Sequence, residues 1–306
     1  MTRPIRHRWR WRAVSTALCI VLASAGVNVA SAHEPDAEEV ALGSLIDAEL
    51  AFAGMCSERG VREAFLANFS DDGIAFEPAP VRLRETWSAR PAAADPLALK
   101  LAWKPAQAGV ARSFDMGYTT GPFMLSTKER PAPAHGVYFS VWQRTPGGAW
   151  KVMLDAGITT PGAVEFAQFG AAPRPHFTGR ANAARERARI IDAEAQAFGH
   201  GDAGLAPNDY ARRVATDVRL HRDGASPIVS RAVVAAAIAR TMSRVAWTPV
   251  DARVSAAGDM AFTYGRYRQI DHDHHISDGY YAHLWLRDRD GAWQLAYDVA
   301  LARLPP

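Results

Sequence analysis

Apolar residues recur along the chain first with the spacing of helices and then with the spacing of strands. Gaps of three and four residues predict an amphipathic helix through Leu42, Leu45, Ile46, Leu50 and Ala53. A second helix is predicted in the same way at Val61, Phe65 and Phe69. The short strand GIAFE, a third helix near 84–89 and four strands in two hairpins follow. Helices first and a meander of strands afterwards predict an α+β unit, with helices on one face of an antiparallel sheet.

The same order of elements returns later in the chain with similar sequences. LIDAE at 45–49 returns as IIDAE at 190–194, a spacing of 145 (190 − 45). YFSVWQR from Tyr138 returns as YAHLWLR from Tyr281, a spacing of 143 (281 − 138). GGAWKVMLDAG at 147–157 returns as DGAWQLAYDVA at 290–300, again at 143 (290 − 147). Matches that stay in register over the whole unit predict a duplicated fold unit.

We therefore predict two domains of like architecture, residues 40–162 and 181–304. Residues 163–180 between them are rich in Pro, Gly and Ala without a helical or strand period, and we interpret them as a linker. Each predicted domain has three N-terminal helices packed on its sheet.

Turn residues mark the hairpins of both predicted domains. Asp115 and Asp259 lie at the turn of the first hairpin, where a short polar side chain is expected to bond its own backbone. Gly148 and Gly291 are expected to close the second hairpin, where a positive φ excludes most other residues.

Residues 1–32 have the composition of a secretory signal peptide. Five arginines and no acidic residue precede the apolar run AVSTALCIVLASAG, and Ala30-Ser31-Ala32 fits the small-residue cleavage rule. The apolar run is short for a stable membrane span, although a retained anchor is the alternative. We expect export to the periplasm or the extracellular space, cleavage after Ala32, a mature chain of 274 residues (306 − 32) and no stable membrane anchor.

Removal of this segment changes the charge of the protein. The full chain has 35 Lys and Arg against 32 Asp and Glu, and loss of five arginines leaves 30 (35 − 5) against 32. A nearly neutral mature chain gives no reason to expect a nucleic-acid partner or binding to an anionic membrane. Cys56 is then the only cysteine, so no intrachain disulfide can form, and we interpret it as a small apolar residue of a helix.

The order helix, helix, strand, helix and four strands, ending in G-x-W-K/Q-x-x-x-x-D, resembles the nuclear transport factor 2-like superfamily. GYTTGPF, VYFSVWQR and GGAWKVMLDAG are most similar to its SnoaL-like branch, which shares the cone fold of ketosteroid isomerase. The resemblance implies two tandem cone-shaped domains, each a curved antiparallel sheet that encloses an apolar cavity with its helices. Isomerases, dehydratases, cyclases and plain binding proteins share this fold, so the resemblance fixes no activity.

Acid–base chemistry in such a cavity needs groups whose pKa values burial has shifted. The second domain has a histidine or tyrosine at three positions where the first has another residue: His221 for Glu77, His283 for Ser140 and Tyr297 for Leu154. The catalytic candidates are therefore His221, His283, Tyr297 and Asp298. Aromatic residues of both sheets are the ligand-binding candidates: Tyr118, Tyr138, Trp142, Tyr264, Tyr281 and Trp285.

The repeated aspartates, Asp155 and Asp298, end the last strand of each predicted domain. Strict alternation along WKVMLD places Trp150 and Leu154 on one face and Asp155 on the other. We therefore expect both aspartates on a solvated or interface face, with Leu154 and Tyr297 toward the cavities, unless a β-bulge reverses the order.

Two other features have weaker interpretations. DHDHHISDG at 271–279 gathers histidines and acids that zinc or copper could bind. Ligands confined to one hairpin tip rarely close a tetrahedral site, so we interpret it as a solvated loop and expect no metal and no cofactor. Arg84 and Arg231 open the third helix of each domain, and a repeated arginine can equally brace the fold, so they are given no site role.

Two classes of function remain open. A secreted binding or scaffold module would hold a small apolar ligand, or would pair sheet to sheet as a domain–domain pseudo-dimer or a homodimer. This class is preferred because the sequence lacks a nucleophile elbow, a phosphate loop and a metal-ligand spacing. The alternative is an acid–base enzyme of the isomerase, dehydratase or cyclase type, with its site in the second domain.

Overall fold

The computed structural model describes residues 36–197 and 205–302, which belong to one compact unit. The same order of elements occurs twice within it, and we call the two parts the first half (37–160) and the second half (183–302). The expected signal peptide, residues 1–32, lies outside the described residues.

The first half consists of three helices and seven strands. In chain order they are α1 (Ala37–Arg59), α2 (Val61–Asn68), β1 (Phe69–Glu77), β2 (Ala79–Arg82), α3 (Leu83–Ser88), β3 (Leu99–Trp103), β4 (Gln107–Val110), β5 (Met116–Thr127), β6 (Ala134–Arg144) and β7 (Trp150–Thr160). A short 3-10 helix, η1 (Phe166–Phe169), follows in the segment that leads to the second half.

The second half repeats this order with a shorter second helix. Its elements are α4 (Ala183–Ala197), α5 (Pro207–Ala211), β8 (Val214–Arg222), β9 (Ile228–Val229), α6 (Arg231–Thr241), β10 (Arg244–Val254), β11 (Met260–Ile270), β12 (Ile276–Arg287) and β13 (Trp293–Ala302).

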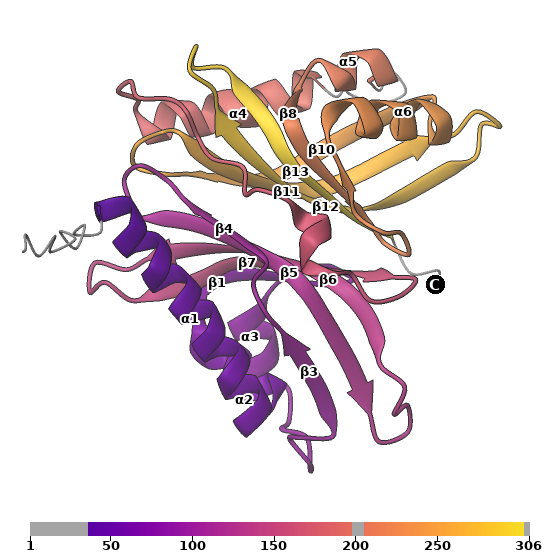
Figure 1. The fold of residues 1–306 in the computed structure, drawn as a ribbon. Helices are drawn as coiled ribbons and strands as arrows, with labels where there is room; N and C mark the ends of the chain where they lie inside the picture. The colour runs from indigo at the N-terminus through magenta and orange to yellow at the C-terminus, as the bar shows by residue number, and fades with distance from the viewer. Residues whose placement is uncertain (1–35, 198–204, 303–306) are drawn as a thin grey trace, which may run out of the picture. The chain divides into compact units, whose positions relative to one another are not determined.

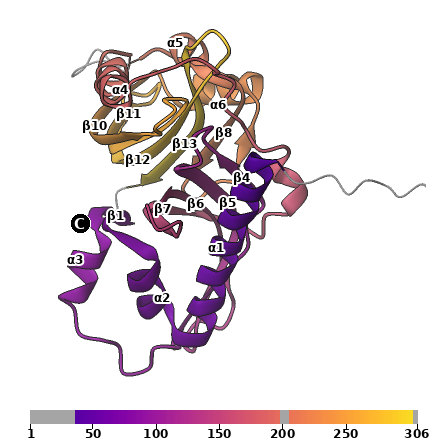
Figure 2. The same cartoon turned by 90° about the vertical axis from the view of Figure 1, so that its left-hand side faces the viewer.

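Each half forms one sheet with its helices on one face (Figures 1 and 2). The strand order is β2-β1-β7-β6-β5-β3, with β4 also paired to β5, in the first half and β10-β11-β12-β13-β8-β9 in the second. This arrangement confirms the α+β class. The sheets are nevertheless mixed, because β1 pairs with β7, and β8 with β13, in parallel. No tight turn joins these pairs, so hairpin geometry does not force them to be antiparallel.

Helix α1 begins with a capping box, in which the side chains of Asp36 and Glu39 bond each other's backbone N–H, and it ends at Arg59, with Gly60 as its C-cap at φ +89°. Leu45, Phe52 and Cys56 lie on its buried face. Leu50, expected on that face, is 43% exposed. Among the described residues, α1 is the one helix long and apolar enough to cross a membrane by length and composition.

The faces of the two sheets that carry no helices pack against each other. One apolar core contains Val137, Phe139 and Leu154 of the first half together with Leu284 and Tyr297 of the second. The arrangement therefore has the form of a pseudo-dimer within one chain, one of the two pairings that the sequence left open. A separate core lies between the sheet and the helices of each half.

The predicted linker, 163–180, is packed between the halves rather than extended from them. Val164 and Phe169 belong to the core between the sheets. The side-chain amide of Gln107 donates to the carbonyl oxygens of Phe169 at 2.7 Å and Ala171 at 2.9 Å. Tyr118 donates its hydroxyl hydrogen to a further carbonyl of the segment, at Pro173. These bonds fix the connection at the interface.

Candidate functional site

A β-bulge in the last strand of each half decides which side chains face the helices. Val152 pairs with Trp142 and Leu154 with Val141, so Met153 is an extra residue on β7. After the bulge the alternation is reversed, and Asp155 faces the helices with Trp150. The expected orientation of Asp155 and Leu154 is therefore wrong.

The same bulge occurs in β13. Leu295 pairs with Trp285 and Tyr297 with Leu284, which leaves Ala296 as the extra residue. Asp298 consequently points toward the helices and is fully buried, whereas Tyr297 lies between the sheets. The prediction that Tyr297 faces a cavity and Asp298 does not is wrong for this reason.

In the first half, helix α1 places the carboxyl of Glu49 against the centre of the sheet. Its Oε1 accepts a hydrogen bond from the indole of Trp103 at 2.5 Å. Its Oε2 accepts from the hydroxyl of Thr119 at 2.5 Å and from the indole of Trp142 at 3.1 Å. All three donors are neutral, so the buried carboxyl has hydrogen bonds but no cation among them.

A cavity of about 200 Å³ lies beside Glu49, and we call it the first-half cavity. Its walls are mostly apolar and aromatic, and it is lined by Glu49, Phe52, Phe65, Leu101, Trp103, Phe123, Leu125, Tyr138, Asp155 and Gly157. Ser140 donates to Asp155 Oδ1 at 2.6 Å. Among the described residues, the buried hydroxyl of Tyr138 has no hydrogen-bond partner. The cavity thus combines a mainly apolar wall with two carboxyls and one phenol.

Burial shifts the acids of this cavity toward their neutral forms. Desolvation raises the pKa of Glu49 to about 7, against the hydrogen bonds from Thr119 and Trp103, and the charge of Asp155 adds to the rise. Desolvation also raises the pKa of Asp155 to about 6, which the bond from Ser140 opposes. Burial raises the pKa of Tyr138 well above its usual value. Both carboxyls therefore change charge near neutral pH.

The corresponding region of the second half is occupied by a buried ionic network. His283 Nδ1 lies 2.5 Å from Glu194 Oε1, and its Nε2 lies 3.3 Å from Asp298 Oδ1. Arg222 makes two hydrogen bonds of 2.7 Å to the two oxygens of Asp298. Tyr210 donates to Asp298 Oδ2 at 2.7 Å. The imidazole ring therefore bridges the two carboxylates.

The charges of this network support one another. Burial disfavours the charged form of Asp298, but the guanidinium of Arg222 and the bond from His283 hold its pKa well below the usual range. Burial also disfavours the imidazolium, yet Asp298 and Glu194 together raise the pKa of His283. The imidazole of His283 therefore belongs to a buried ion network and lies between the carboxyls of Glu194 and Asp298.

The structure brings His283 and Asp298 together but separates His221 from them. The parallel register pairs Asp298 with Leu220 and Val299 with His221, and it pairs Asp155 with Ala75. Glu77 therefore corresponds to Arg222 and not to His221, which corrects the alignment by one residue. His221 lies between the sheets, edge-on to Tyr297 at 5.7 Å, where burial lowers its pKa to about 3.

The aromatic candidates fall into three groups. Tyr138 lines the first-half cavity, and Trp142 bonds Glu49 behind it. Tyr118 and Tyr264 belong to the core between the sheets, so they contact the other half rather than a cavity. Tyr281 and Trp285 lie in the core under the helices of the second half.

The two repeated arginines make equivalent local bonds. Arg84 donates to the carbonyl of Phe69 at 3.5 Å, and Arg231 donates to the carbonyl of Val214 at 3.0 Å. Phe69 and Val214 begin corresponding strands, so both arginines brace the strand that follows the second helix. Cys56 is buried and its thiol pKa is raised to about 11 by desolvation, as a packing residue requires.

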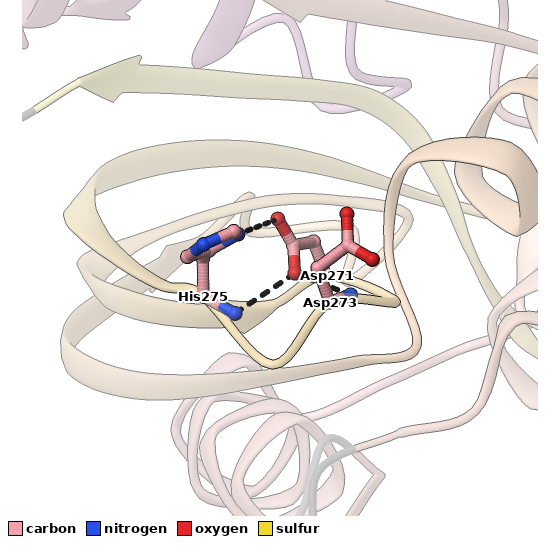
Figure 3. A group of neighbouring side chains, drawn as sticks. All are labelled: Asp271, Asp273 and His275. Carbon is pink, nitrogen blue, oxygen red and sulfur yellow. Dashed lines mark hydrogen bonds and ion pairs between the residues drawn. The ribbon is translucent and has the colours of Figure 1, made fainter.

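The His- and Asp-rich tip between β11 and β12 places three metal-ligating groups together (Figure 3). Ligand atoms of Asp271, Asp273 and His275 lie within 4.8 Å of one another. The carboxylate of Asp271 already accepts from the backbone N–H groups of Asp273 and His275, both at 2.8 Å, and contacts the His275 ring at 3.1 Å. These bonds account for the grouping as the closure of an exposed turn.

Sequence reasoning missed the acids that the helices contribute, Glu49 and Glu194. Both are fully buried and both end the repeated motif LIDAE or IIDAE. The available signal was an acid four residues after Leu45, on the same helical face as Phe52. A carboxyl on a buried apolar face is costly and indicates a site or an ion network.

No protein-family model matches the sequence, and no curated protein matches it. A ketosteroid isomerase-like protein from Erwinia carotovora atroseptica is similar in structure, with 15% identity and a TM-score of 0.31 over 39% of this chain and 95% of its own. A conserved protein from Planctomyces limnophilus has 13% identity and a TM-score of 0.29, over 38% and 94%. An LEH-like epoxide hydrolase from M. tuberculosis has 15% identity and a TM-score of 0.28, over 38% and 78%.

Proposed function

We propose that the protein binds a small, mainly apolar molecule in the first-half cavity. The second half then serves as a scaffold that supports the first sheet from behind. The observation that carries this proposal is the contrast between corresponding sites. Glu49 and Asp155 line a cavity, whereas His283 fills the region between Glu194 and Asp298. A concave, largely apolar site with a few convergent polar groups is the usual form of a ligand site.

The test is a screen of small soluble fragments against the mature chain, in which binding is detected by chemical-shift changes in NMR spectra. Gly157→Leu is the blocking variant, because Gly157 lines the cavity and a Cβ there meets only the ring of Phe123, at 3.4 Å. Gly43→Leu adds the same side chain to the exposed face of α1, where a Cβ meets nothing within 4 Å. We expect fragments that shift residues of the first-half cavity in the wild type and in Gly43→Leu but not in Gly157→Leu. Fragments that bind all three proteins equally would refute the site.

Acid–base catalysis is the second candidate, now in the first half rather than the second. It is favoured by the pKa values of about 7 for Glu49 and about 6 for Asp155, which suit proton transfer near neutral pH. Tyr138 would supply a neutral hydrogen-bond donor. Turnover of a bound fragment that is lost in both Glu49→Gln and Asp155→Asn would favour the enzyme. Tight binding of a ligand from the source organism without any turnover would favour a binding function over catalysis.

We also propose that the chain is exported and that residues 1–32 are removed. The arginines, the apolar run and Ala30-Ser31-Ala32 support this. N-terminal sequencing of the protein from its source tests it. A mature chain that begins at His33 is the expected result, and a chain that retains residues 1–32 would contradict it.

A further inference from the structure

We propose that the ligand of the first-half cavity is an organic cation, a protonated amine or a quaternary ammonium carried on a compact apolar body. This inference rests on the proposed function, because it names the chemical class of the molecule that the same cavity would hold.

The charges around the cavity are the first argument. Glu49 and Asp155 both line it, and among the described residues that line it there is no Lys, Arg or His. The hydrogen bonds to the two carboxyls come from neutral groups, the indoles of Trp103 and Trp142 and the hydroxyls of Thr119 and Ser140. A fully buried acid, Glu49, and a partly buried one, Asp155, without a cation form a site that attracts positive charge.

The second half supplies an internal comparison for this charge pattern. There the imidazole of His283 lies between Glu194 and Asp298, and Arg222 binds Asp298 from the other side. The first half has Ser140 at the position of His283 and Glu77 at the position of Arg222. The same pair of acids is thus neutralised by built-in cations in one half and left without them in the other. A bound cation would lie near Glu49 and Asp155 and neutralise them, as His283 does for Glu194 and Asp298.

The aromatic wall is an independent argument. Five of the lining residues are aromatic: Phe52, Phe65, Phe123, Trp103 and Tyr138. The rings of Phe52 and Trp103 stand edge to face at 4.9 Å, as do those of Phe52 and Phe65. Aromatic faces attract ammonium groups through their negative quadrupoles, and such cages with nearby acids are typical of ammonium recognition. The unpartnered hydroxyl oxygen of Tyr138 can accept a hydrogen bond from an ammonium N–H.

The size of the cavity restricts the apolar body. A volume of about 200 Å³ is below the usual range for drug-sized ligands, roughly 300–1,000 Å³. A single ring or a short branched chain that carries the ammonium group is therefore the expected scale. A fused polycyclic molecule would have to displace the aromatic walls.

Binding of a cation would be linked to the ionisation of the two acids. The titratable groups that face Glu49 are Asp155 from β7 and Tyr138 from β6, while β5 contributes only the hydroxyl of Thr119. Tyr138 stays neutral because its pKa is raised, so only the carboxyls change charge near neutral pH. A cation favours their ionised forms, so its affinity should rise between about pH 5 and pH 8 as protons leave them.

The experiment uses the mature chain and three probes of nearly equal size: benzylammonium, benzyl alcohol and benzoate. Their affinities are measured by NMR titration at about pH 5 and about pH 8, where benzylammonium keeps its charge. We expect benzylammonium to bind at least about tenfold more tightly than benzyl alcohol at the higher pH, and benzoate to bind most weakly. We expect the affinity for benzylammonium to fall at least about tenfold at the lower pH.

Variants separate the contributions of the acids from other effects. Glu49→Gln and Asp155→Asn should each remove most of the preference for benzylammonium over benzyl alcohol. Asp47→Asn removes a charge from an exposed position of the same helix and should leave the preference unchanged. Equal losses in Asp47→Asn and Glu49→Gln would overturn the inference, because a long-range charge effect would then explain both.

The outcomes distinguish this inference from the proposed function. Benzyl alcohol binding as tightly as benzylammonium, with both blocked by Gly157→Leu, would overturn the cation inference and leave the cavity as a ligand site. If neither these probes nor any neutral fragment gives shifts that depend on Gly157→Leu, the proposed function and the cation inference fail together.

Discussion

Asp115 and Asp259 make the same hydrogen bond in opposite directions between the two halves. Asp115 Oδ2 accepts from the backbone N–H of Ala256 at 2.9 Å, and Asp259 Oδ2 accepts from the backbone N–H of Arg112 at 2.9 Å. The other oxygen of each carboxylate accepts from a serine hydroxyl of its own turn. Reciprocal contacts of this kind characterise a two-fold interface, so the halves pack like the subunits of a dimer. Each aspartate was expected to bond its own backbone, but it accepts from a serine hydroxyl of its own turn and from a backbone N–H of the other half.

Removal of these carboxylates should weaken the whole compact unit. Asp259 is fully buried and Asp115 only partly, so the loss should be larger at Asp259. We expect Asp259→Ala to lower the free energy of unfolding by about 2–3 kcal/mol and Asp115→Ala by about 1–2 kcal/mol. Urea denaturation measures both. An unchanged midpoint for Asp259→Ala would show that the reciprocal bonds contribute nothing.

Tyr297 provides a test of the corrected strand orientation. Its hydroxyl donates to Gln107 Oε1 at 2.5 Å across the halves, and it lies outside the residues that line the first-half cavity. Tyr297→Phe should therefore cost about 1–3 kcal/mol of stability, because a buried acceptor is left unpaired, and should leave ligand affinity unchanged. Tyr138→Phe is the matched variant, since its hydroxyl has no partner among the described residues. Tyr138→Phe should leave the stability of the protein almost unchanged and alter its affinity for a ligand of the first-half cavity. A loss of stability in Tyr138→Phe together with a change of affinity in Tyr297→Phe would contradict the assignment of the two tyrosines to opposite faces.

The ion network of the second half should be necessary for folding stability. His283→Ser gives this half the residue that the first half has at the same position, Ser140. The change leaves Glu194 facing Asp298 without the imidazolium, and we expect a loss of about 3–5 kcal/mol. Thermal unfolding at about pH 6 measures it. A loss below about 1 kcal/mol would mean that His283 is neutral and only fills space.

The sign of the pH effect at His283 follows from the direction of its shift. Its pKa is raised in the folded protein, so its contribution is fully present below the unfolded pKa of 6.5 and is lost as the pH rises through the folded value. The difference in stability between wild type and His283→Ser should therefore shrink above neutral pH. A difference that grows with pH would exclude the imidazolium.

Glu49 should make the protein less stable at higher pH. Its pKa is raised from 4.5 to about 7, so the neutral carboxyl is favoured in the folded state. Its contribution is fully present below about pH 4.5 and is lost as the pH rises through about 7, a change of roughly 3 kcal/mol. Glu49→Gln cannot ionise, so its stability relative to wild type should increase over this range.

Denaturation of wild type, Glu49→Gln and the control Asp47→Asn at several pH values measures this effect. Asp47 is exposed, so its replacement should leave the wild-type pH dependence in place. Parallel pH profiles for wild type and Glu49→Gln would show that folding does not raise the pKa of Glu49.

Local sequence signals located the elements and their turns. Gly148 and Gly291 have φ of +87° and +81°, the positive values that the predicted hairpin turns require and that residues with a Cβ rarely adopt. The helices of the first half lie close to their predicted positions, except that Phe69, predicted to continue the second helix, begins β1. Such signals depend only on residues that are close in sequence, so they can be recognised in a single sequence.

The site was harder to predict because it depends on registers that extend beyond a few neighbours. One extra residue in β7, Met153, moves Asp155 from one face to the other, and nothing in WKVMLD marks it. The pairing of β8 with β13 shifted the alignment of His221 by one residue. The histidines of the second half predicted a site there, whereas the site that we propose in the first half has Ser140 at the position of His283.

We propose that the first half contains the ligand site and that the second half does not. Trp103 and Trp247 occupy corresponding positions in the repeated sequence of the two halves. Trp103 bonds Glu49 at the first-half cavity, and Trp247 packs against His283 at 5.3 Å, so their indole N–H signals report on the two sites separately. Both signals can be assigned by Trp→Phe substitution and followed in one NMR titration with benzylammonium at about pH 8. We expect a saturable shift of the Trp103 signal while the Trp247 signal stays in place. A saturable shift of Trp247 with Trp103 unmoved would instead place the ligand in the second half.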